Sequence, residues 1–304
     1  MNILVTGMTG YIGSRLVPRL QGERYAVRGL SRHGGPAPPG VTLVTGDAVS
    51  GAGLERAMDG IDVAYYLIHS MEPSGDGTLA AREQRAAESF ARAASVAGVK
   101  RTVYLGGLIP IGGPVSAHLA TRLQVEGILN EASPCPVTLR ASIVIGAGSR
   151  PFRLLVRLVE RLPVMILPNW HTNRTSPIDE RDVIELLARA ATSERVCGET
   201  IDAGGPEELS YGELIARIGH HLMLDRPTVA FRSVSATPIT SRIVATLTGE
   251  AHELVGPLMD SLASDLLPRS DAAAAVLGVK LHSLDAAIEH SLREGEDSEP
   301  LAGR

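Results

Sequence analysis

The stretch TGMTGYIG, Thr6 to Gly13, decides the fold of this chain. It carries a Gly-x-x-Gly-x-x-Gly pattern directly after an apolar run at Asn2–Thr6 and directly before a segment with helical periodicity. In such a strand-turn-helix the first glycine allows a sharp turn, the second lets the backbone approach a pyrophosphate, and the third lets the helix pack on the sheet. The alternative is a tight turn that binds nothing. The pattern predicts a dinucleotide-binding loop formed by Gly7, Thr9, Gly10, Tyr11, Ile12 and Gly13.

Strands and helices alternate along the chain after this loop. The further short apolar runs, bounded by Gly, Pro or Asp, are Tyr25–Leu30, Val41–Thr45, Val63–Ile68, Thr102–Leu105 and Val137–Val144. Segments between them show helical periodicity, most clearly Thr78–Gly98, where small apolar residues form a narrow stripe. This alternation predicts an α/β fold, a Rossmann-type doubly wound parallel sheet.

The alternation becomes less regular after Gly148. Helices are expected at Pro151–Arg161 and Asp179–Thr192, the second started by Asp179 and Asp182 as capping and first-turn carboxylates. We therefore expect a dinucleotide-binding core at residues 1–148, followed at 149–295 by a smaller C-terminal substrate lobe mixed with returning core elements. The polar residues 296–304 are expected to form a disordered tail.

Composition narrows the classes of partner. The 304 residues carry a formal charge of -5, so there is no basic surface of the kind that binds nucleic acid. No apolar run approaches the ~18 residues of a membrane span, and the sequence starts in a strand, so a cytoplasmic protein without a membrane partner is expected. Cys135 and Cys197 lack metal-ligand spacing and are expected to be separate buried thiols, with no metal site.

The end of the second strand predicts which dinucleotide is bound. An NAD site places a carboxylate there for the ribose hydroxyls, whereas an NADP site places a cation and small donors for the 2′-phosphate. Here the residues are Ser31 and Arg32, so NADP(H) is expected, unless Arg32 is only a solvated loop residue. Asp47, followed by Ala48 after the third strand, is placed either to meet the adenine amino group or to cap the next helix.

Several stretches together resemble a known family. They are TGMTGYIG, GDAVS after strand three, YYLIHSM at strand four, RTVYLGGL at strand five and TLRASIVIGAGS at strand six. The combination resembles the atypical or extended short-chain dehydrogenase/reductase superfamily, in its NmrA-like, NAD(P)H-binding branch. The resemblance covers about residues 1–280, including the later block SPIDERDVIELL.

The resemblance implies where the cofactor and substrate lie. In the family, nicotinamide lies over the carboxyl ends of strands four to six. Carried over to this sequence, the residues near the cofactor are Leu67, Ile68, His69, Gly106, Gly107, Ala141, Ser142 and Ile143. The substrate would be covered by Met71, the loop around Pro168–Thr175 and the C-terminal helices.

This sequence departs from the family at its catalytic positions. Reductases of the superfamily carry a serine after strand five and a Tyr-x-x-x-Lys on the next helix, whose tyrosine donates a proton to the alkoxide. Here Gly106-Gly107 occupies the serine position, and His118-x-x-x-Arg122 occupies the Tyr-x-x-x-Lys position. The resemblance supports cofactor binding and leaves the proton donor open.

The replacements allow several roles. Arg122 can hold the nicotinamide ribose, as the family lysine does. His118 can be an acid-base group, a polar contact to substrate or cofactor, or a structural hydrogen bonder; Arg122 one turn away disfavours its imidazolium form. His69 either contacts the cofactor or holds the loop after strand four.

The loop LPVMILPNWHTNRTSP predicts a substrate wall. Met165, Trp170 and His171 are placed in it to cover a flat aromatic substrate, and the alternative is that Trp170 only docks the loop onto the sheet.

Three functions agree with these features. The first is an NADPH-dependent ketoreductase for a bulky aromatic ketone of the angucyclinone polyketide type, in which a phenol of the substrate supplies the proton. The second is a non-catalytic NADP-binding redox sensor like the NmrA-type regulators. The third is an accessory subunit that uses the fold as a scaffold.

Overall fold

A seven-stranded parallel sheet forms the centre of the protein, in the order β11-β6-β5-β4-β1-β2-β3. The computed structural model describes residues 1–69, 78–112, 115–224, 226–230, 262–269 and 272–298. The strands of the sheet are β1 (Asn2–Thr6), β2 (Ala26–Ser31), β3 (Val41–Thr45), β4 (Val63–Tyr66), β5 (Arg101–Gly107), β6 (Cys135–Ala141) and β11 (Thr200–Ala203). The predicted Rossmann-type fold is confirmed, and the strand order reverses beside β1, as in doubly wound sheets.

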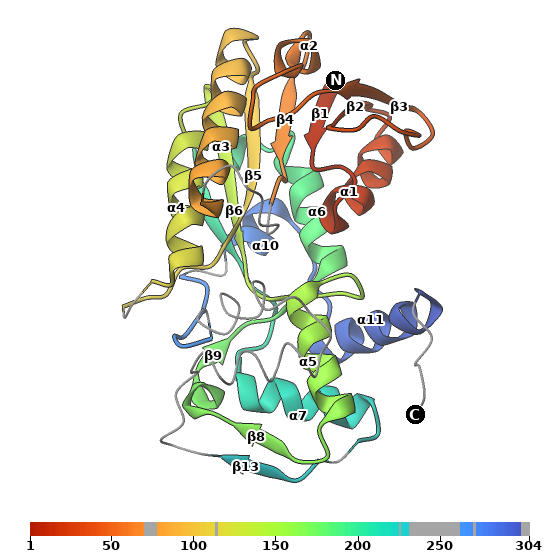
Figure 1. Ribbon diagram of the computed structural model, residues 1–304, viewed down its shortest axis with the longest axis vertical. Coiled ribbons are helices and arrows are strands. Elements are labelled where there is room, and N and C mark those ends of the chain that lie inside the picture. The colour runs from red at the N-terminus through yellow and green to blue at the C-terminus, as the bar shows by residue number, and fades with distance from the viewer. Residues whose placement is uncertain (70–77, 113–114, 225, 231–261, 270–271, 299–304) are drawn as a thin grey trace.

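Helices cover both faces of this sheet (Figure 1). One layer holds α1 (Tyr11–Gly22), α6 (Glu180–Ala190) and α10 (Ala272–Leu277), and the other holds α2 (Leu54–Met58), α3 (Leu79–Val96) and α4 (Ala117–Leu129). The stripe predicted on α3 is buried at Ala86, Phe90 and Ala94. Thr78 caps this helix by accepting a hydrogen bond from the Ala81 amide at 3.3 Å. Small side chains allow α3 to lie close to the sheet.

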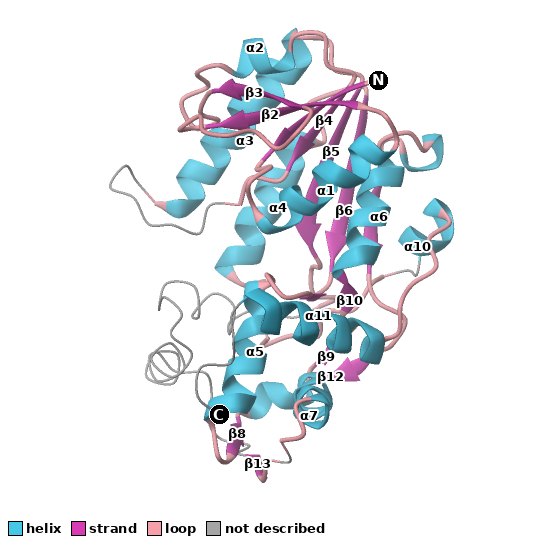
Figure 2. Ribbon diagram, turned by 90° about the vertical axis from the view of Figure 1, so that its right-hand side faces the viewer, coloured by secondary structure: helices cyan, strands magenta, loops and turns pink. Residues whose placement is uncertain are grey.

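A smaller lobe lies beyond the carboxyl ends of the strands (Figure 2). Its helices are α5 (Arg150–Arg161), α7 (Tyr211–His221) and α11 (Leu284–Ser298). Its short strands and turns are β7 (Val144–Ile145), β8 (Met165–Leu167), η1 (Asn169–Thr172), β9 (Arg174–Thr175), β10 (Ile178–Asp179), β12 (Leu209–Ser210) and β13 (Thr228–Ala230). The three helices and the loop before β9 share a hydrophobic core of their own, which is separate from the two layers on the sheet.

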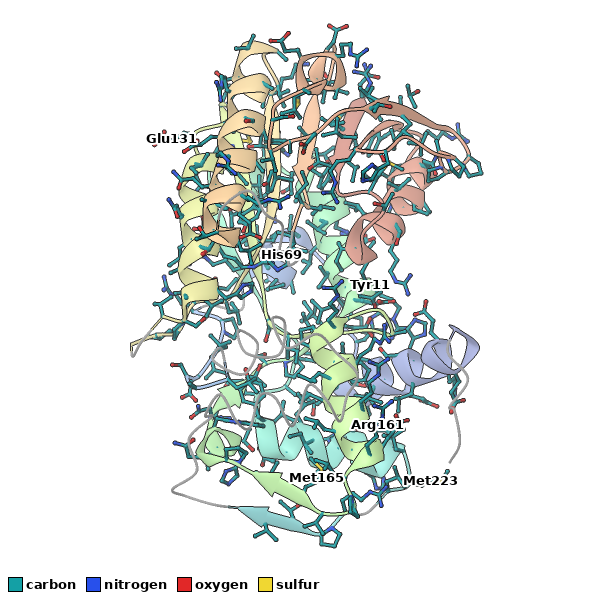
Figure 3. All side chains as sticks on the ribbon, in the orientation of Figure 1. Tyr11, His69, Glu131, Arg161, Met165 and Met223 are labelled. Atoms are coloured by element: carbon teal, nitrogen blue, oxygen red, sulfur yellow. A yellow bond between two sulfur atoms is a disulfide. The ribbon has the colours of Figure 1, made fainter. Side chains whose placement is uncertain are left out.

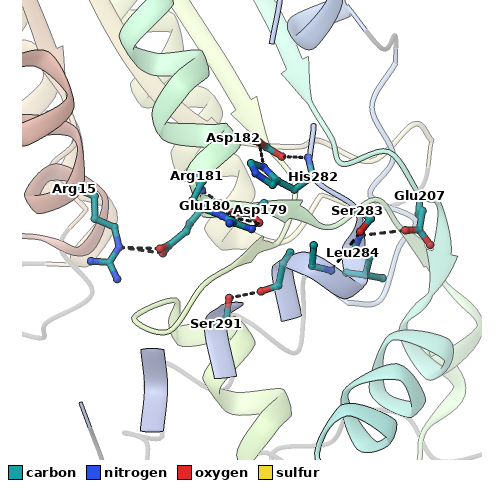
Figure 4. A network of polar contacts seen from close by, with 12 residues as sticks. Arg15, Asp179, Glu180, Arg181, Asp182, Glu207, His282, Ser283, Leu284 and Ser291 are labelled. Atoms are coloured by element: carbon teal, nitrogen blue, oxygen red, sulfur yellow. Dashed lines mark hydrogen bonds and ion pairs between the residues drawn. The ribbon is translucent and has the colours of Figure 1, made fainter. Parts of the chain in front are cut away.

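The chain returns from the lobe to the sheet through α6, the turn η2 (Glu194–Val196) and β11. Asp179 caps α6 by accepting from the Arg181 amide at 2.8 Å, as predicted, and Asp182 accepts from the backbone amide of His282 at 2.8 Å. Figure 4 shows these contacts beside the bond from the Leu284 amide to Glu207. Asp182, in the first turn of α6, thus attaches the segment before α11 to this helix.

Two expectations need correction. Helix α11 continues to Ser298, so residues 296–298 are helical and do not belong to a disordered tail; the rest of the predicted tail lies outside the described residues. Cys135 and Cys197 are joined in a disulfide, with Cα atoms 4.8 Å apart, because β11 pairs with β6 and brings the two segments together. Within the described residues, no helix has the length and apolarity that crossing a bilayer requires.

Candidate functional site

One cavity of about 670 Å³ opens at the carboxyl ends of the strands, between the sheet and the lobe. Six strand ends contribute to its lining, as the topology of a parallel sheet requires. The predicted cofactor residues that line it are Gly7, Thr9, Gly10, Tyr11, Ile12, Gly13, Ser31, Arg32, Asp47, Ala48, Leu67, Ile68, His69, Gly106, Gly107, Arg122, Ala141, Ser142 and Ile143. The structure therefore brings together every residue of that set.

The glycine loop is shaped for close backbone approach. Gly7 has a φ of +73°, and a Cβ atom there would lie 2.6 Å from the carbonyl oxygen of Leu67. A Cβ atom on Gly13 would lie 2.2 Å from the carbonyl oxygen of Gly7. The N-cap of α1 is Gly10, which supplies no side-chain cap, so no side chain occupies the amides of the first turn from that position. An uncapped helix N-terminus behind a glycine turn fits the pyrophosphate of a dinucleotide.

The end of the cavity beside β2 and β3, where adenosine is expected, carries Arg32, Ser31 and Asp47. Arg32 is exposed, and within the described chain it forms no ion pair. Asp47 accepts a hydrogen bond from the Val49 amide at 3.0 Å and so closes a turn. It does not cap α2, whose N-cap is Gly53. A guanidinium that faces the cavity without a described partner can bind an added phosphate.

Two histidines face each other at the opposite end. The rings of His69 and His118 are 5.3 Å apart between centroids, and both line the cavity. Nδ1 of His69 lies 3.1 Å from Oε1 of Glu83 on α3, which is buried. Arg122, one turn after His118, donates to the carbonyl oxygen of Leu105 at 3.4 Å, at the end of β5. His118 and Arg122 lie one turn apart on α4, so both side chains face the cavity.

The surroundings of His69 and His118 favour the neutral form of both imidazole rings. Burial lowers the pKa of His118 to about 4, and the Arg122 guanidinium acts in the same direction. Burial and Arg122 also lower the pKa of His69, against the effect of Glu83. The lowered pKa of His118 was predicted from Arg122 alone, whereas burial is the larger cause.

The predicted substrate wall is only partly in place. His118 lines the cavity, whereas Met165, Trp170 and His171 do not. Trp170 and Met165 are 6% and 3% exposed in the core of the lobe, and Nδ1 of His171 lies 2.8 Å from the Pro168 carbonyl oxygen. Figure 3 places Met165 at the end of the lobe distant from His69. The tyrosine of the lobe that lines the cavity is Tyr211, and Tyr11 lines it from the glycine loop; Met71 lies outside the described residues.

Sequence reasoning missed several lining residues. They include His33, Arg82, Leu108, Leu119, Arg150, Pro151, Leu154, Leu155, Tyr211, Leu262 and Leu266. The sequence SYGE does signal the start of α7, because Ser210 and Glu213 form a capping box there. That signal would have placed Tyr211 at a helix N-terminus, but which lobe element faces the sheet depends on tertiary packing.

A second group of polar residues lies outside this cavity, between α1, α6 and α11. Ligand atoms of Glu180, His290 and Glu294 all lie within 4.8 Å of one another. Arg15 forms ion pairs with both Glu180 and Glu294, so a positive charge from the protein already lies between the two carboxylates. The arrangement serves to attach α11 to the core.

Comparison with known proteins identifies the first part of the chain. Residues 7–131 match a family model described as NAD(P)H-binding. The chain is 26% identical over 241 residues to the (4-alkanoyl-5-oxo-2,5-dihydrofuran-3-yl)methyl phosphate reductase of Streptomyces griseus, covering 74% of each. It is 32% identical over 106 residues to a 3-beta-hydroxysteroid dehydrogenase of Mycolicibacterium neoaurum, 34% of this chain and 28% of that protein. The chain thus spans little more than a quarter of the first curated relatives' length.

Solved structures agree on the fold. The crystal structure of gox2253 aligns with this protein at a TM-score of 0.77 and 17% sequence identity, over 98% of each chain. The UDP-glucuronic acid 4-epimerase of Bacillus cereus, in complex with UDP-glucuronic acid and NAD, has a TM-score of 0.71 at 20% identity, covering 98% of this chain and 100% of that one. Residues 7–131 therefore match an NAD(P)H-binding family, and the solved structures share the fold of the chain. The prediction of a nicotinamide dinucleotide cofactor is confirmed.

Proposed function

We propose that the protein is an NADPH-dependent ketoreductase that acts on a bulky aromatic ketone of the angucyclinone polyketide type. The observation that carries this proposal is the continuity of one cavity from the glycine loop to the apolar lobe. At the lobe end the cavity is lined by Leu154, Leu155 and Tyr211, beside the bare backbone of Gly106 and Gly107. An apolar surface with an aromatic residue suits a flat ring system.

Reduction is favoured over other reactions of the superfamily by the relatives. The Streptomyces griseus relative, whose alignment with this chain spans 74% of each protein, is a reductase. NADP(H) is favoured over NAD(H) by Arg32 and Ser31, since the cavity offers a cation and a hydroxyl at the end of β2 and no carboxylate within that strand end. When bound there, the reduced nicotinamide would supply a hydride.

The source of the proton follows from the side chains beside the reacting carbonyl. Gly106 and Gly107 have none to offer, Arg122 donates without releasing a proton, and burial keeps His118 neutral at about pH 7. A phenol beside the ketone can give its proton to the carbonyl oxygen as negative charge develops there. The protein then has to hold the ring in place and exclude water.

Product formation tests the proposal directly. The purified protein is incubated with NADPH and a panel of aromatic polyketide ketones, and carbinol products are followed by chromatography and mass spectrometry. Reduction of hydroxyl-flanked ketones, with NADPH preferred over NADH, is the expected result. Reduction of simple aliphatic ketones alone would contradict the proposed substrate class.

A second candidate is a non-catalytic NADP-binding regulator of the NmrA type. The observation that favours it is the replacement of all the family catalysts, at Gly106, Gly107, His118 and Arg122. Tight binding of NADPH without turnover of any ketone in the panel would support this candidate over the reductase.

A further inference from the structure

A buried carboxylate fixes the orientation of His69. His69 follows β4, and Glu83 lies on α3 with 7% of its side chain exposed. Nδ1 of His69 and Oε1 of Glu83 are 3.1 Å apart. A carboxylate only accepts hydrogen bonds, so Nδ1–H is the donor and Nε2 carries the lone pair.

The other ring nitrogen has no partner. Nε2 of His69 is buried and forms no hydrogen bond within the described residues, although His69 lines the cavity. A buried acceptor that lacks a donor costs stability. A ligand that brings a hydroxyl to Nε2 would remove this cost, so the cavity is built for a substrate with a hydrogen-bond donor at this point.

Charges from three helices act on this ring. Arg122 on α4 and Arg150 at the start of α5 lower the pKa of His69, Glu83 on α3 raises it, and burial lowers it most. The ring of His118, also on α4, is 5.3 Å away between centroids. His69 is therefore a neutral imidazole, which is a competent proton acceptor, and an anion at Nε2 would favour its protonated form.

We propose that His69, oriented by Glu83, exchanges a proton through Nε2 with a hydroxyl of the substrate, namely the phenol beside the reacting carbonyl. This inference rests on the proposed ketoreductase function and completes its proton transfer. Glu83 is a positioning residue, because it acts through His69, as the carboxylate of a catalytic triad acts through its histidine.

The steps balance in both directions. In reduction, a hydride adds to the carbonyl carbon and the negatively charged oxygen takes the phenolic proton. The phenolate beside Nε2 favours uptake of one proton from solvent by the neutral imidazole, and Nε2–H then passes this proton to the phenolate, which leaves the imidazole neutral again. In oxidation, the hydride leaves the carbinol carbon for the oxidised nicotinamide, the carbinol O–H proton moves to the phenolic oxygen, neutral Nε2 takes the phenolic proton, and the imidazolium releases it to solvent. His69 thus acts as an acid in one direction and as a base in the other.

His118 is the matched comparison for this assignment. It lines the same cavity, but within the described chain no carboxylate hydrogen-bonds to its ring. Burial and the Arg122 charge oppose an imidazolium there, and the opposite effect of the Glu83 charge on the pKa of His118 is smaller. His69 has both an orienting carboxylate and a buried ring nitrogen without a described partner, whereas within the described residues no carboxylate orients the ring of His118.

Nitrogen NMR tests the inference without turnover. The complex of the protein with NADP⁺ is titrated with 1-hydroxyanthraquinone and with its methyl ether, and the ¹⁵N shifts of the His69 ring are followed against pH. We expect Nδ1 protonated and Nε2 unprotonated at pH 7, with Nε2 perturbed by the free phenol and less by the ether. Nε2–H in the free protein, or equal perturbation by both compounds, would overturn the inference.

Kinetics with matched variants provide a second test of the role of His69. Loss of an acid-base group typically lowers kcat by about 10²–10⁴-fold, so we expect that range for His69→Gln and a much smaller loss for His118→Gln. Reduction by the wild type should slow as pH rises through the pKa of His69, and oxidation should accelerate. Glu83→Gln should move both inflections to lower pH, since the carboxylate that raises the pKa of His69 is lost. Equal losses in the two histidine variants, or an unmoved pH profile in Glu83→Gln, would exclude the pair.

The two proposals fail in different ways. If no ketone is reduced, the proposed function fails, and the NMR titration still decides whether Nε2 is the acceptor of a ligand hydroxyl. If ketones are reduced and the NADPH affinity of His69→Gln matches that of the wild type with full kcat, only the role of His69 fails.

Discussion

The ring of Trp170 meets the ring of Tyr211 edge-on, with centroids 6.2 Å apart. Only Tyr211 lines the cavity, so Trp170 supports the substrate wall from behind. The two aromatic residues therefore divide the roles that the sequence assigned to the tryptophan loop: Tyr211 contacts the ligand side, and Trp170 fills the core of the lobe.

Trp170→Ala should lower the free energy of unfolding by about 3–5 kcal/mol, because a large side chain that is 6% exposed leaves a cavity. Tyr211→Ala is the comparison, since it removes an aromatic ring from the ligand side and should raise KM for aromatic ketones. Urea unfolding and steady-state kinetics separate the two. If Trp170→Ala is as stable as the wild type but has a raised KM, Trp170 contacts the substrate and this prediction is wrong.

Arg32→Ala should weaken NADPH binding about ten- to hundredfold and hardly change NADH binding, because a charge-assisted hydrogen bond contributes about 1.5–3 kcal/mol. Calorimetry with both cofactors measures this. Arg92→Ala, at an exposed arginine outside the cavity lining, serves as the control. Equal losses for the two cofactors would show that Arg32 does not contact the 2′-phosphate.

Much of the core could be predicted because its signals are local. The strand Asn2–Thr6, the glycine turn and the start of α1 are consecutive, and the predicted first strand matches β1 residue for residue. Helices α5 and α6 also begin within a residue of their predicted starts, where Pro151 and Asp179 give chemical start signals.

The rest of the site depends on contacts between distant segments. His69 and Glu83 are 14 residues apart, on a strand end and a helix, and no spacing rule places a carboxylate on the ring. The disulfide between Cys135 and Cys197 spans 62 residues and arises only when β11 joins the edge of the sheet. Tertiary packing also decided that Tyr211, and not Trp170, faces the cavity.

Gly13→Ala should destabilise the protein by about 1–3 kcal/mol and weaken cofactor binding, because its Cβ atom would lie 2.2 Å from the Gly7 carbonyl oxygen and force the loop to shift. Gly22→Ala on the same helix meets nothing within 4 Å and should stabilise by up to about 1 kcal/mol. Thermal unfolding with and without NADPH measures both. If Gly13→Ala binds NADPH with unchanged affinity, the glycine loop can accommodate a Cβ atom at this position and the prediction is wrong.

His118→Ala should keep a substantial part of the turnover. With a pKa lowered to about 4 by burial, His118 is neutral throughout pH 5 to 8, so it has no proton to donate there and its removal should not change the pH profile in that range. Steady-state rates across this range provide the measurement. A fall of about 10²–10⁴-fold in kcat with unchanged cofactor affinity would identify it as an obligatory acid.

A substrate pair that differs only in the phenol beside the ketone, free or methylated, decides how the proton reaches the carbonyl oxygen. The free phenol has an O–H that can serve the developing charge, whereas the methyl ether has none and adds a methyl group near Gly106 and Gly107. We expect the ether to be reduced at least about tenfold more slowly, with binding measured separately so that a steric effect of the methyl group is recognised. If the ether binds as well and is reduced as fast, assistance by the substrate is excluded, and the proton must pass directly from a protein group to the carbonyl oxygen. In that case His69→Gln should abolish reduction of both compounds equally, because Nε2 of His69 is a buried nitrogen of the cavity that has no hydrogen-bond partner among the described residues.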